Sequence, residues 1–286
     1  MASETRGATG FGDKLARAMT RTGSLLCVGL DPDPTRFPTA LRAMPAGEAI
    51  VAFNRAIVEA TSDLVCAYKP NLGFYAAAGL PGIEALLATR DLIPREIPVI
   101  LDCKVNDVGN TAAAWARGLF DEWDFDGITV NPYLGEDSIA PFLSYPDRGV
   151  FILCKTSNPG SGELQDLAVR DSGSPLFLDV ARRAKRWAND YPATVGLVVG
   201  ATYPSQLGEV RAALGDLPIL VPGVGAQAGD ATSVVSHGLD GTGAGLVINV
   251  SRAITYAGSG EDFAEQARKA ATRFRDQINA ARVPGS

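Results

Sequence analysis

Residues 97–111 read Ile97-Pro98-Val99-Ile100-Leu101-Asp102-Cys103-Lys104-Val105-Asn106-Asp107-Val108-Gly109-Asn110-Thr111. The apolar run 97–100 predicts a buried strand, and the alanine-rich segment 111–117 predicts a helix. Charged residues therefore stand where a strand ends and a helix begins. In a sheet covered by helices, that boundary is the functional edge.

Three charged side chains crowd this boundary: Asp102, Lys104 and Asp107. Charged groups are costly to desolvate, so their grouping beside a buried strand favours a functional site. The alternative is a structural one, in which a carboxylate caps the helix and the other charges form a surface ion pair. The stretch by itself leaves both interpretations open.

The same succession of strand and helix recurs along the chain. Apolar runs predict eight strands, at residues 25–31, 64–69, 97–100, 127–130, 149–155, 194–199, 218–221 and 245–250. Amphipathic or capped segments predict helices at 11–22, 46–61, 81–92, 110–123, 138–143, 175–190, 204–214, 230–236 and 262–281. This alternation favours a single (β/α)8 TIM barrel over an open doubly wound sheet. We expect the barrel to span residues 11–281, with tails at 1–10 and 282–286.

Polar residues gather where the predicted strands end. They are Asp31, Lys69, Asn71, Asp102, Lys104, Asn131, Lys155, Ser157 and Arg252. Barrel active sites lie at the carboxyl ends of the strands, which is where these residues would meet. The connection 156–173 is long and rich in Gly, Ser and Pro, as functional loops and lids often are.

Composition narrows the class of protein. The 286 residues carry 26 Lys and Arg against 32 Asp and Glu, with no basic run suited to a phosphate backbone, so nucleic acid is not an expected partner. No apolar run reaches the roughly 18 residues of a membrane span, and the start of the chain does not resemble a signal segment. We therefore expect a cytoplasmic protein with no membrane association. The four cysteines are expected to be reduced and buried, and the single histidine, His237, to end a helix.

Glycine-rich and basic residues follow the last two predicted strands. The segment 221–227 contains Gly223 and Gly225, and Arg252 follows the eighth strand. Loops at these positions of a barrel commonly bind phosphate, because glycine lets backbone N–H groups approach an anion and arginine adds a bidentate donor. The alternative is that the glycines serve only to form turns.

Two other chemistries remain open from the residues alone. Lys69 and Lys155 could form Schiff bases or could be surface cations, although nearby carboxylates favour an ion pair for Lys69. Asp31, Asp102 and Asp107 could hold magnesium. A magnesium site needs carboxylates whose negative charge is not already neutralised. Lys69 and Lys104 would neutralise two of these carboxylates, which argues against a metal.

The combined motifs resemble the orotidine 5'-phosphate decarboxylase family, in its longer bacterial (type 2) subgroup. The motifs are Gly29-Leu30-Asp31, Lys69-Pro70-Asn71, Asp102-x-Lys104-x-x-Asp107 with Thr111, Thr156-Ser157-Asn158-Pro159-Gly160, Val221-Pro222-Gly223-Val224-Gly225-Ala226-Gln227 and Arg252. They cover about residues 25 to 255. The Asp-x-Lys-x-x-Asp run also occurs in related sugar-phosphate enzymes, but those metal-dependent relatives tend to carry a metal-binding acid where this chain has Lys69.

The resemblance implies a residue-by-residue assignment of roles. Lys69, Asp102, Lys104 and Asp107 would form an alternating charged array, and a homodimer would place Asp107 and Thr111 in the neighbouring subunit's active site. The implied substrate contacts are Asp31 and Asn71 with the ribose, Ser157 with the pyrimidine, and Gln227 and Arg252 with the phosphate. Lys155 and His237 receive no role.

The implied reaction converts orotidine 5'-monophosphate to UMP and CO2 in de novo pyrimidine biosynthesis. It would need no metal or organic cofactor, and Lys104 would protonate C6. The alternatives are a magnesium-dependent sugar-phosphate decarboxylase, a Schiff-base aldolase, and a non-enzymatic barrel that binds a phosphorylated ligand.

Overall fold

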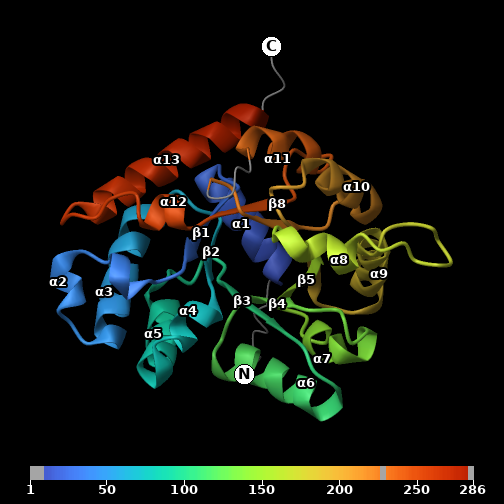
Figure 1. The fold of residues 1–286 in the computed structure, drawn as a ribbon, viewed down its shortest axis with the longest axis horizontal. Coiled ribbons are helices and arrows are strands. Elements are labelled where there is room, and N and C mark those ends of the chain that lie inside the picture. The colour runs from blue at the N-terminus through green and yellow to red at the C-terminus, as the bar shows by residue number, and fades with distance from the viewer. Residues whose placement is uncertain (1–9, 226–229, 283–286) are drawn as a thin grey trace, which may run out of the picture.

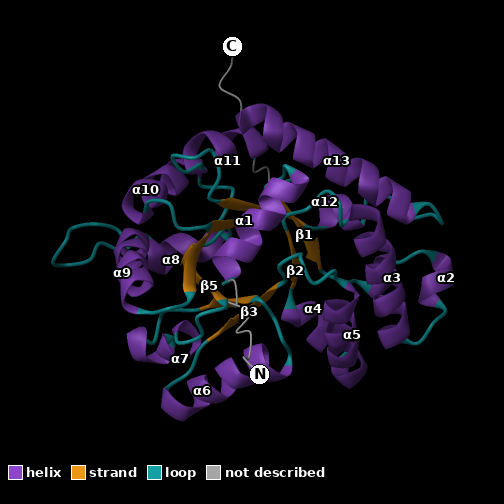
Figure 2. Cartoon of the chain, turned by 180° about the vertical axis from the view of Figure 1, so that it is seen from behind, coloured by secondary structure: helices purple, strands orange, loops and turns teal. Residues whose placement is uncertain are grey.

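The computed structural model describes residues 10–225 and 230–282. Within them, eight strands form one parallel sheet at the centre of the molecule, and helices surround it (Figures 1 and 2). The strands are β1 (Leu26–Leu30), β2 (Ala67–Pro70), β3 (Ile100–Val105), β4 (Gly127–Val130), β5 (Gly149–Lys155), β6 (Thr194–Val199), β7 (Ile219–Pro222) and β8 (Leu246–Val250).

Helical segments connect the strands. The longer helices are α1 (Phe11–Thr22), α3 (Ala46–Thr61), α5 (Gly79–Leu92), α6 (Gly109–Arg117), α9 (Leu176–Asp190), α10 (Pro204–Leu214), α11 (Ala231–Gly238) and α13 (Phe263–Arg282). Shorter segments are α2 (Thr39–Arg42), α4 (Leu72–Ala76), α7 (Ala140–Leu143), α8 (Gly162–Gln165), α12 (Arg252–Thr255), the 3-10 helices η1 (Pro34–Arg36), η3 (Glu136–Ser138) and η4 (Pro159–Ser161), and the π-helix η2 (Gly118–Glu122).

The sheet closes on itself. Its order is β2-β1-β8-β7-β6-β5-β4-β3, and the two outer strands are joined by parallel bridges between Tyr68 and Val99 and between Asn71 and Asp102. A closed parallel sheet alternating with surrounding helices is a (β/α)8 TIM barrel, which confirms the predicted fold. Closure also brings the ends of β2 and β3 together, although only short pairing connects them.

The core has two layers. Alternate strand residues point outward and pack against the helices, while a smaller cluster fills the barrel and includes Cys27, Phe151, Leu220 and Val247. Helix α1 contributes Phe11 to this inner cluster. The barrel interior is thus filled with apolar side chains, so an active site has room only at an end of the barrel.

Helix α1 covers the amino ends of the strands. Phe11 lies against Gly127 and Gly149, the first residues of β4 and β5, where an added Cβ at Gly149 would lie 2.6 Å from the ring. These two glycines therefore leave room for the Phe11 ring. With this end closed, the carboxyl ends of the strands form the free rim.

Strand β3 differs from its prediction. The apolar pattern placed the strand at 97–100, whereas β3 runs from Ile100 to Val105. Asp102 and Lys104 therefore lie on the strand itself, at its carboxyl end. The apolar pattern could not reveal this because the charged residues interrupt it.

The other differences are local. β2 begins at Ala67, three residues later than predicted, and the predicted helix 110–123 divides into α6 and η2. The short helices α2, α4, α8 and α12 were not predicted. The predicted tails fall largely on 1–9 and 283–286, which lie outside the described residues. Among the described helices, none is both long and apolar enough to cross a membrane.

Candidate active site

Two lysines flank one carboxylate at the carboxyl end of the barrel. Lys69 on β2 donates to Oδ2 of Asp102 on β3 at 3.0 Å, and Lys104 donates to Oδ1 at 2.5 Å. Lys69 is 3% exposed, and the Lys104 side chain is 45% exposed. Barrel closure accounts for the contact, since it sets β2 beside β3. The predicted Lys69–Asp102–Lys104 grouping is present, and the alternative that Lys69 is a surface cation is wrong.

The cluster fixes the charges of Asp102 and Lys69. Burial opposes ionisation of Asp102, but the two ammonium groups outweigh it and hold its pKa well below the usual range. Burial likewise opposes the charged form of Lys69, but Asp102 and Asp31 outweigh it and raise the lysine pKa. At neutral pH the site holds a carboxylate between two ammonium groups.

Asn71 also meets this carboxylate. Its amide nitrogen donates to Asp102 Oδ2 at 3.1 Å, while its Oδ1 accepts from the Gly73 amide and caps α4. An asparagine directly after a strand serves both purposes, because a short polar side chain can satisfy the first free amides of a helix. The contact with ribose implied by the resemblance stays a prediction.

Asp31 is joined to the end of β8. Ser251 donates to Asp31 Oδ2 at 2.5 Å, and Oδ1 of the same carboxylate is buried without a hydrogen-bond partner among the described residues. Gly29 permits this approach, since a Cβ there would lie 2.7 Å from the Ser251 Cβ. The carboxylate thus keeps a free acceptor at the rim. Sequence reasoning missed Ser251, which immediately precedes Arg252.

The second half of the charged motif faces elsewhere. Asp107 lies after β3 and accepts a hydrogen bond from the Val108 amide, and Thr111 is exposed on α6. Within the described part of the chain, Asp107 forms no ion pair. The structure therefore brings Lys69, Asp102 and Lys104 together within one subunit and leaves Asp107 and Thr111 outside that cluster.

The loop after β5 is fixed at its base. Ser157 packs against Gly200 at the end of β6, where a Cβ would lie 2.6 Å from the serine Cβ. Lys155 is 1% exposed, donates to Asp166 Oδ1 at 2.7 Å, and lies 4.6 Å from the Tyr203 ring centroid. The alternative that Lys155 is a surface cation is wrong, because its side chain is buried. Its ion pair with Asp166 joins the end of β5 to the loop that follows it.

The glycines after β7 serve the turn. Gly223 has φ 98° and Gly225 has φ 84°, a region that favours glycine. A Cβ at Gly225 would also lie 2.9 Å from the Phe274 ring. The glycines therefore have the conformation that the turn requires. Whether their amides also bind an anion stays a prediction. Gln227 lies outside the described residues, and Arg252 is exposed at the start of α12.

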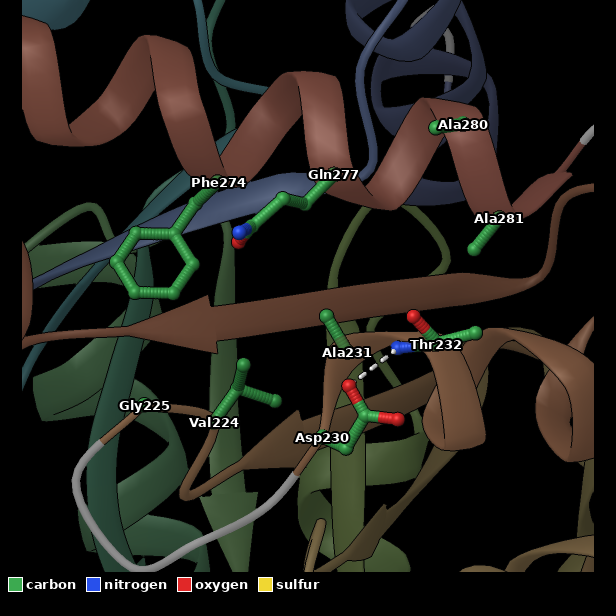
Figure 3. Close-up of a pocket in the computed structure, with 9 residues that line it drawn as sticks. All are labelled: Val224, Gly225, Asp230, Ala231, Thr232, Phe274, Gln277, Ala280 and Ala281. Atoms are coloured by element: carbon green, nitrogen blue, oxygen red, sulfur yellow. Dashed lines mark hydrogen bonds between the residues drawn. The ribbon is translucent and has the colours of Figure 1, made fainter.

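A hollow of about 480 Å³ lies beside this turn, between α11 and α13 (Figure 3). Val224 and Phe274 line it, and Asp230, also at its edge, caps α11 through the amides of Thr232 and Ser233. Its walls are mostly apolar and carry none of the charged array. It belongs to the helical layer and is not the centre of the site.

The remaining candidate groups are structural. His237 occupies the last turn of α11 as predicted, with Nδ1 2.9 Å from the Ser233 carbonyl oxygen. All four cysteines are free thiols, and burial raises the pKa of both Cys27 and Cys103 to about 12. In the described ranges, no three His, Cys, Asp or Glu side chains lie close enough to hold a metal ion.

The comparisons with known proteins agree with this geometry. The model of the "Orotidine 5'-phosphate decarboxylase / HUMPS family" matches residues 24–269. Orotidine 5'-phosphate decarboxylase of Thermomicrobium roseum is 55% identical over 268 residues, which are 94% of this chain and 94% of that protein. This chain belongs to that family.

Other members of the orotidine 5'-phosphate decarboxylase family support the assignment. The Cellvibrio japonicus enzyme is 48% identical, over 96% of this chain and 99% of its own. The structure of the Leishmania donovani OMP decarboxylase has a TM-score of 0.83 and 39% identity, covering 97% of this chain and all of that one. The match extends over nearly the whole barrel, so the charged array lies within the shared fold.

Proposed function

We propose that this protein decarboxylates orotidine 5'-monophosphate to UMP and CO2 in de novo pyrimidine biosynthesis, without a metal or organic cofactor. The observation that carries the proposal is the Asp102 carboxylate held between Lys69 and Lys104 at the barrel rim. The family matches support the same activity. We further propose that residues 11–281 form the catalytic unit, of the type 2 subgroup, and that it acts in the cytoplasm.

The chemical difficulty lies at C6 of the pyrimidine. When the bond from C6 to the carboxylate breaks, its electron pair stays on C6, which has no adjacent group to delocalise it. The Lys104 ammonium stabilises this developing charge and then transfers a proton to C6, and the lysine regains a proton from water. Because Asp102 fixes the ammonium beforehand, the stabilisation needs little reorganisation during the reaction.

Asp102 faces the carboxylate of the substrate in this arrangement. Two like charges about 4 Å apart repel by roughly 4 kcal/mol at an effective dielectric near 20. Loss of CO2 relieves that repulsion. Lys69 keeps Asp102 ionised and in place, so the main contribution of the array is electrostatic stabilisation of the transition state.

The remaining contacts orient the substrate. Asp31 and Asn71 contact the ribose, Ser157 the pyrimidine, and Arg252 with Gln227 the phosphate. The free Oδ1 of Asp31 supports the first assignment, since a buried carboxylate oxygen needs a donor and a ribose hydroxyl provides one. The bond from Ser251 to Asp31 sets this carboxylate beside the start of α12, where Arg252 lies.

The active unit is a homodimer in which Asp107 and Thr111 enter the neighbouring site. Asp107 has no cationic partner in the described part of its own chain, and exposed apolar side chains follow it in the sequence. Val108 is 57% exposed and Trp115 is 38% exposed. A hollow of about 390 Å³ along α6 is lined by Thr111 and Trp115. Exposed apolar groups around the second half of the motif support a subunit contact there.

The function is tested by the loss of substrate absorbance on adding purified protein and by UMP formation. Lys104→Ala is expected to reduce turnover by at least about 10²-fold, because it removes both the cation and the proton donor. Near-native turnover in this variant would exclude the role proposed for Lys104. Wild-type protein treated with EDTA is expected to keep its activity, whereas a loss restored by magnesium would favour the metal-dependent relatives.

A further inference from the structure

Thr129 lies at the point where β4 meets the charged end of β3. Its side chain is 1% exposed, and its hydroxyl makes three contacts with the neighbouring strand. The oxygen accepts from the amides of Cys103 at 3.1 Å and Lys104 at 2.9 Å, and the hydroxyl donates to Asp102 Oδ1 at 3.0 Å. One side chain therefore contacts the whole segment that carries the catalytic pair.

The strand register explains why this hydroxyl is needed. Leu101 pairs with Ile128 and Val105 with Val130, so three residues of β3 stand opposite Thr129 alone. Such a bulge removes backbone groups from the regular ladder. The Thr129 hydroxyl takes the place of the missing carbonyl partner for two of these amides.

The bulge also sets the conformation of Lys104. Its φ is 51°, in the left-handed region, which is strained for a residue with a side chain. Strain of this kind persists only where surrounding contacts enforce it, and it clusters at functional sites. The hydrogen bond from the Lys104 amide to Thr129 is one such contact.

The direction of the third hydrogen bond is fixed. Both amides are donors, so the threonine oxygen accepts from them, and its single proton remains for the Asp102 carboxylate. The same oxygen of Asp102 receives the Lys104 ammonium, and the other receives Lys69. Thr129 thus links the backbone of Lys104 to the carboxylate that holds its ammonium group.

We propose that Thr129 is a positioning residue for the decarboxylation, whose hydroxyl holds the bulge that aims Asp102 and Lys104 at C6. The proposal rests on the proposed function. Thr129 does not itself contact the reacting atoms. A displacement of the pair by a fraction of its contact distance lowers turnover, since misplacement by about 1 Å can cost on the order of 10²-fold in rate.

The experiment compares Thr129→Val with Thr129→Ser. Valine keeps the branched shape but leaves two amides and one carboxylate oxygen without this partner, whereas serine keeps the hydroxyl. We expect kcat of Thr129→Val to fall by about 10- to 100-fold, with KM and UMP affinity within roughly 3-fold of wild type. Thr129→Ser is expected to keep kcat within roughly 3-fold.

Thr89→Val provides the matched control. Thr89 is another fully buried threonine, and its hydroxyl accepts from Asn54 in the helical layer. We expect its substitution to lower stability in urea without lowering kcat. A general loss of stability would affect both valine variants alike, whereas positioning of the catalytic pair affects only Thr129→Val.

Three results would overturn the proposal. They are a native kcat in Thr129→Val, an equal loss of kcat in Thr129→Ser and Thr129→Val, or a loss of kcat in Thr89→Val as large as that in Thr129→Val. If Thr129→Val yields no folded protein, Thr129→Ala takes its place, and failure of both would make the hydroxyl a determinant of folding instead. A wild-type protein without decarboxylase activity would refute the proposed function, so the two failures are distinguishable.

Discussion

Asp102 is the residue on which the site depends. Its carboxylate accepts hydrogen bonds from four side chains, those of Lys69, Asn71, Lys104 and Thr129. A buried carboxylate is tolerated only when such partners replace water. The same contacts that make the charge tolerable also leave it with one orientation, which is what a preorganised site needs.

The protonation of Asp102 predicts a pH dependence of stability. Its pKa is lower in the folded protein than the value of about 3.9 in an unfolded chain, so its stabilising contribution is present above that value. The contribution is lost as pH falls towards the folded-state pKa, because the unfolded chain then binds the proton first. An asparagine at position 102 does not titrate in this pH range, so Asp102→Asn lacks this pH-dependent contribution.

We therefore expect the stability difference between wild type and Asp102→Asn to depend on pH. Urea denaturation should give a constant difference between pH 7 and about pH 5, because Asp102 is ionised in both states there. Below about pH 4 the difference should narrow, approaching about 1.4 kcal/mol per pH unit. A difference that stays constant down to pH 3 would mean that the two lysines do not lower the pKa of Asp102.

The sequence revealed the charged residues of the site but not the groups that hold them. Asp102 and Lys104 stood out because charges interrupted an apolar run. Thr129 and Ser251 gave no such signal, since a threonine or serine at a strand end is common and its role depends on the strand beside it. Register and bulges arise from tertiary pairing, which a single sequence does not contain.

At the scale of elements, the segment after β5 shows how a loop is fastened to the barrel. Lys155 at the strand end is buried, while its partner Asp166 is 50% exposed at the end of α8. The side chain of Gln165 adds hydrogen bonds in both directions with Thr156. The loop that carries Ser157 is thereby closed at its base. The sequence predicted the strand and the long loop, but not the pairing that joins them.

Removing one partner of this pair should reveal its contribution. Asp166→Asn is expected to lower the free energy of unfolding by about 1–2 kcal/mol, less than for a fully buried pair because Asp166 is half exposed. Adding Lys155→Met should recover part of the loss, since no buried cation remains unpaired. Urea denaturation measures both.

An exposed pair on α13 supplies the control for that measurement. Glu265 and Lys269 are more than half exposed, and Glu265→Gln should leave the free energy of unfolding nearly unchanged. If Asp166→Asn and Glu265→Gln have the same small effect, Lys155 does not depend on Asp166. A double variant that is less stable than Asp166→Asn alone would contradict the burial argument.

At the scale of the whole molecule, the alternation of eight strands with helices sufficed to predict the barrel. The pattern worked because most of the strands are buried on both faces, and the longer helices bury apolar residues against them. The pattern did not predict where β3 ends, because this strand carries the charged residues of the site. The pattern also carries no information on subunit contacts, so the dimer rests on the family resemblance and on the exposed groups near Asp107.

The proposed division of one motif between two sites predicts complementation. Lys104→Ala disables the site of its own subunit, whereas Asp107→Ala disables the site of its neighbour. In a mixed dimer, the subunit with Asp107→Ala keeps its own Lys104 and receives an intact Asp107 from its partner. One complete site is therefore present in every mixed dimer, and both defects fall on the other.

Refolding the two inactive variants together in equal amounts should then restore activity. Random pairing makes about half of the dimers mixed, each with one working site, so we expect roughly a quarter of wild-type activity. Lys104→Ala refolded with Asp102→Asn is the matched control and should stay inactive, because both residues act in their own subunit. Restoration in neither mixture would mean that Asp107 serves its own barrel, and the dimer would not be needed to complete the site. Restoration in both mixtures would contradict the assignment of Asp102 and Lys104 to the same active site.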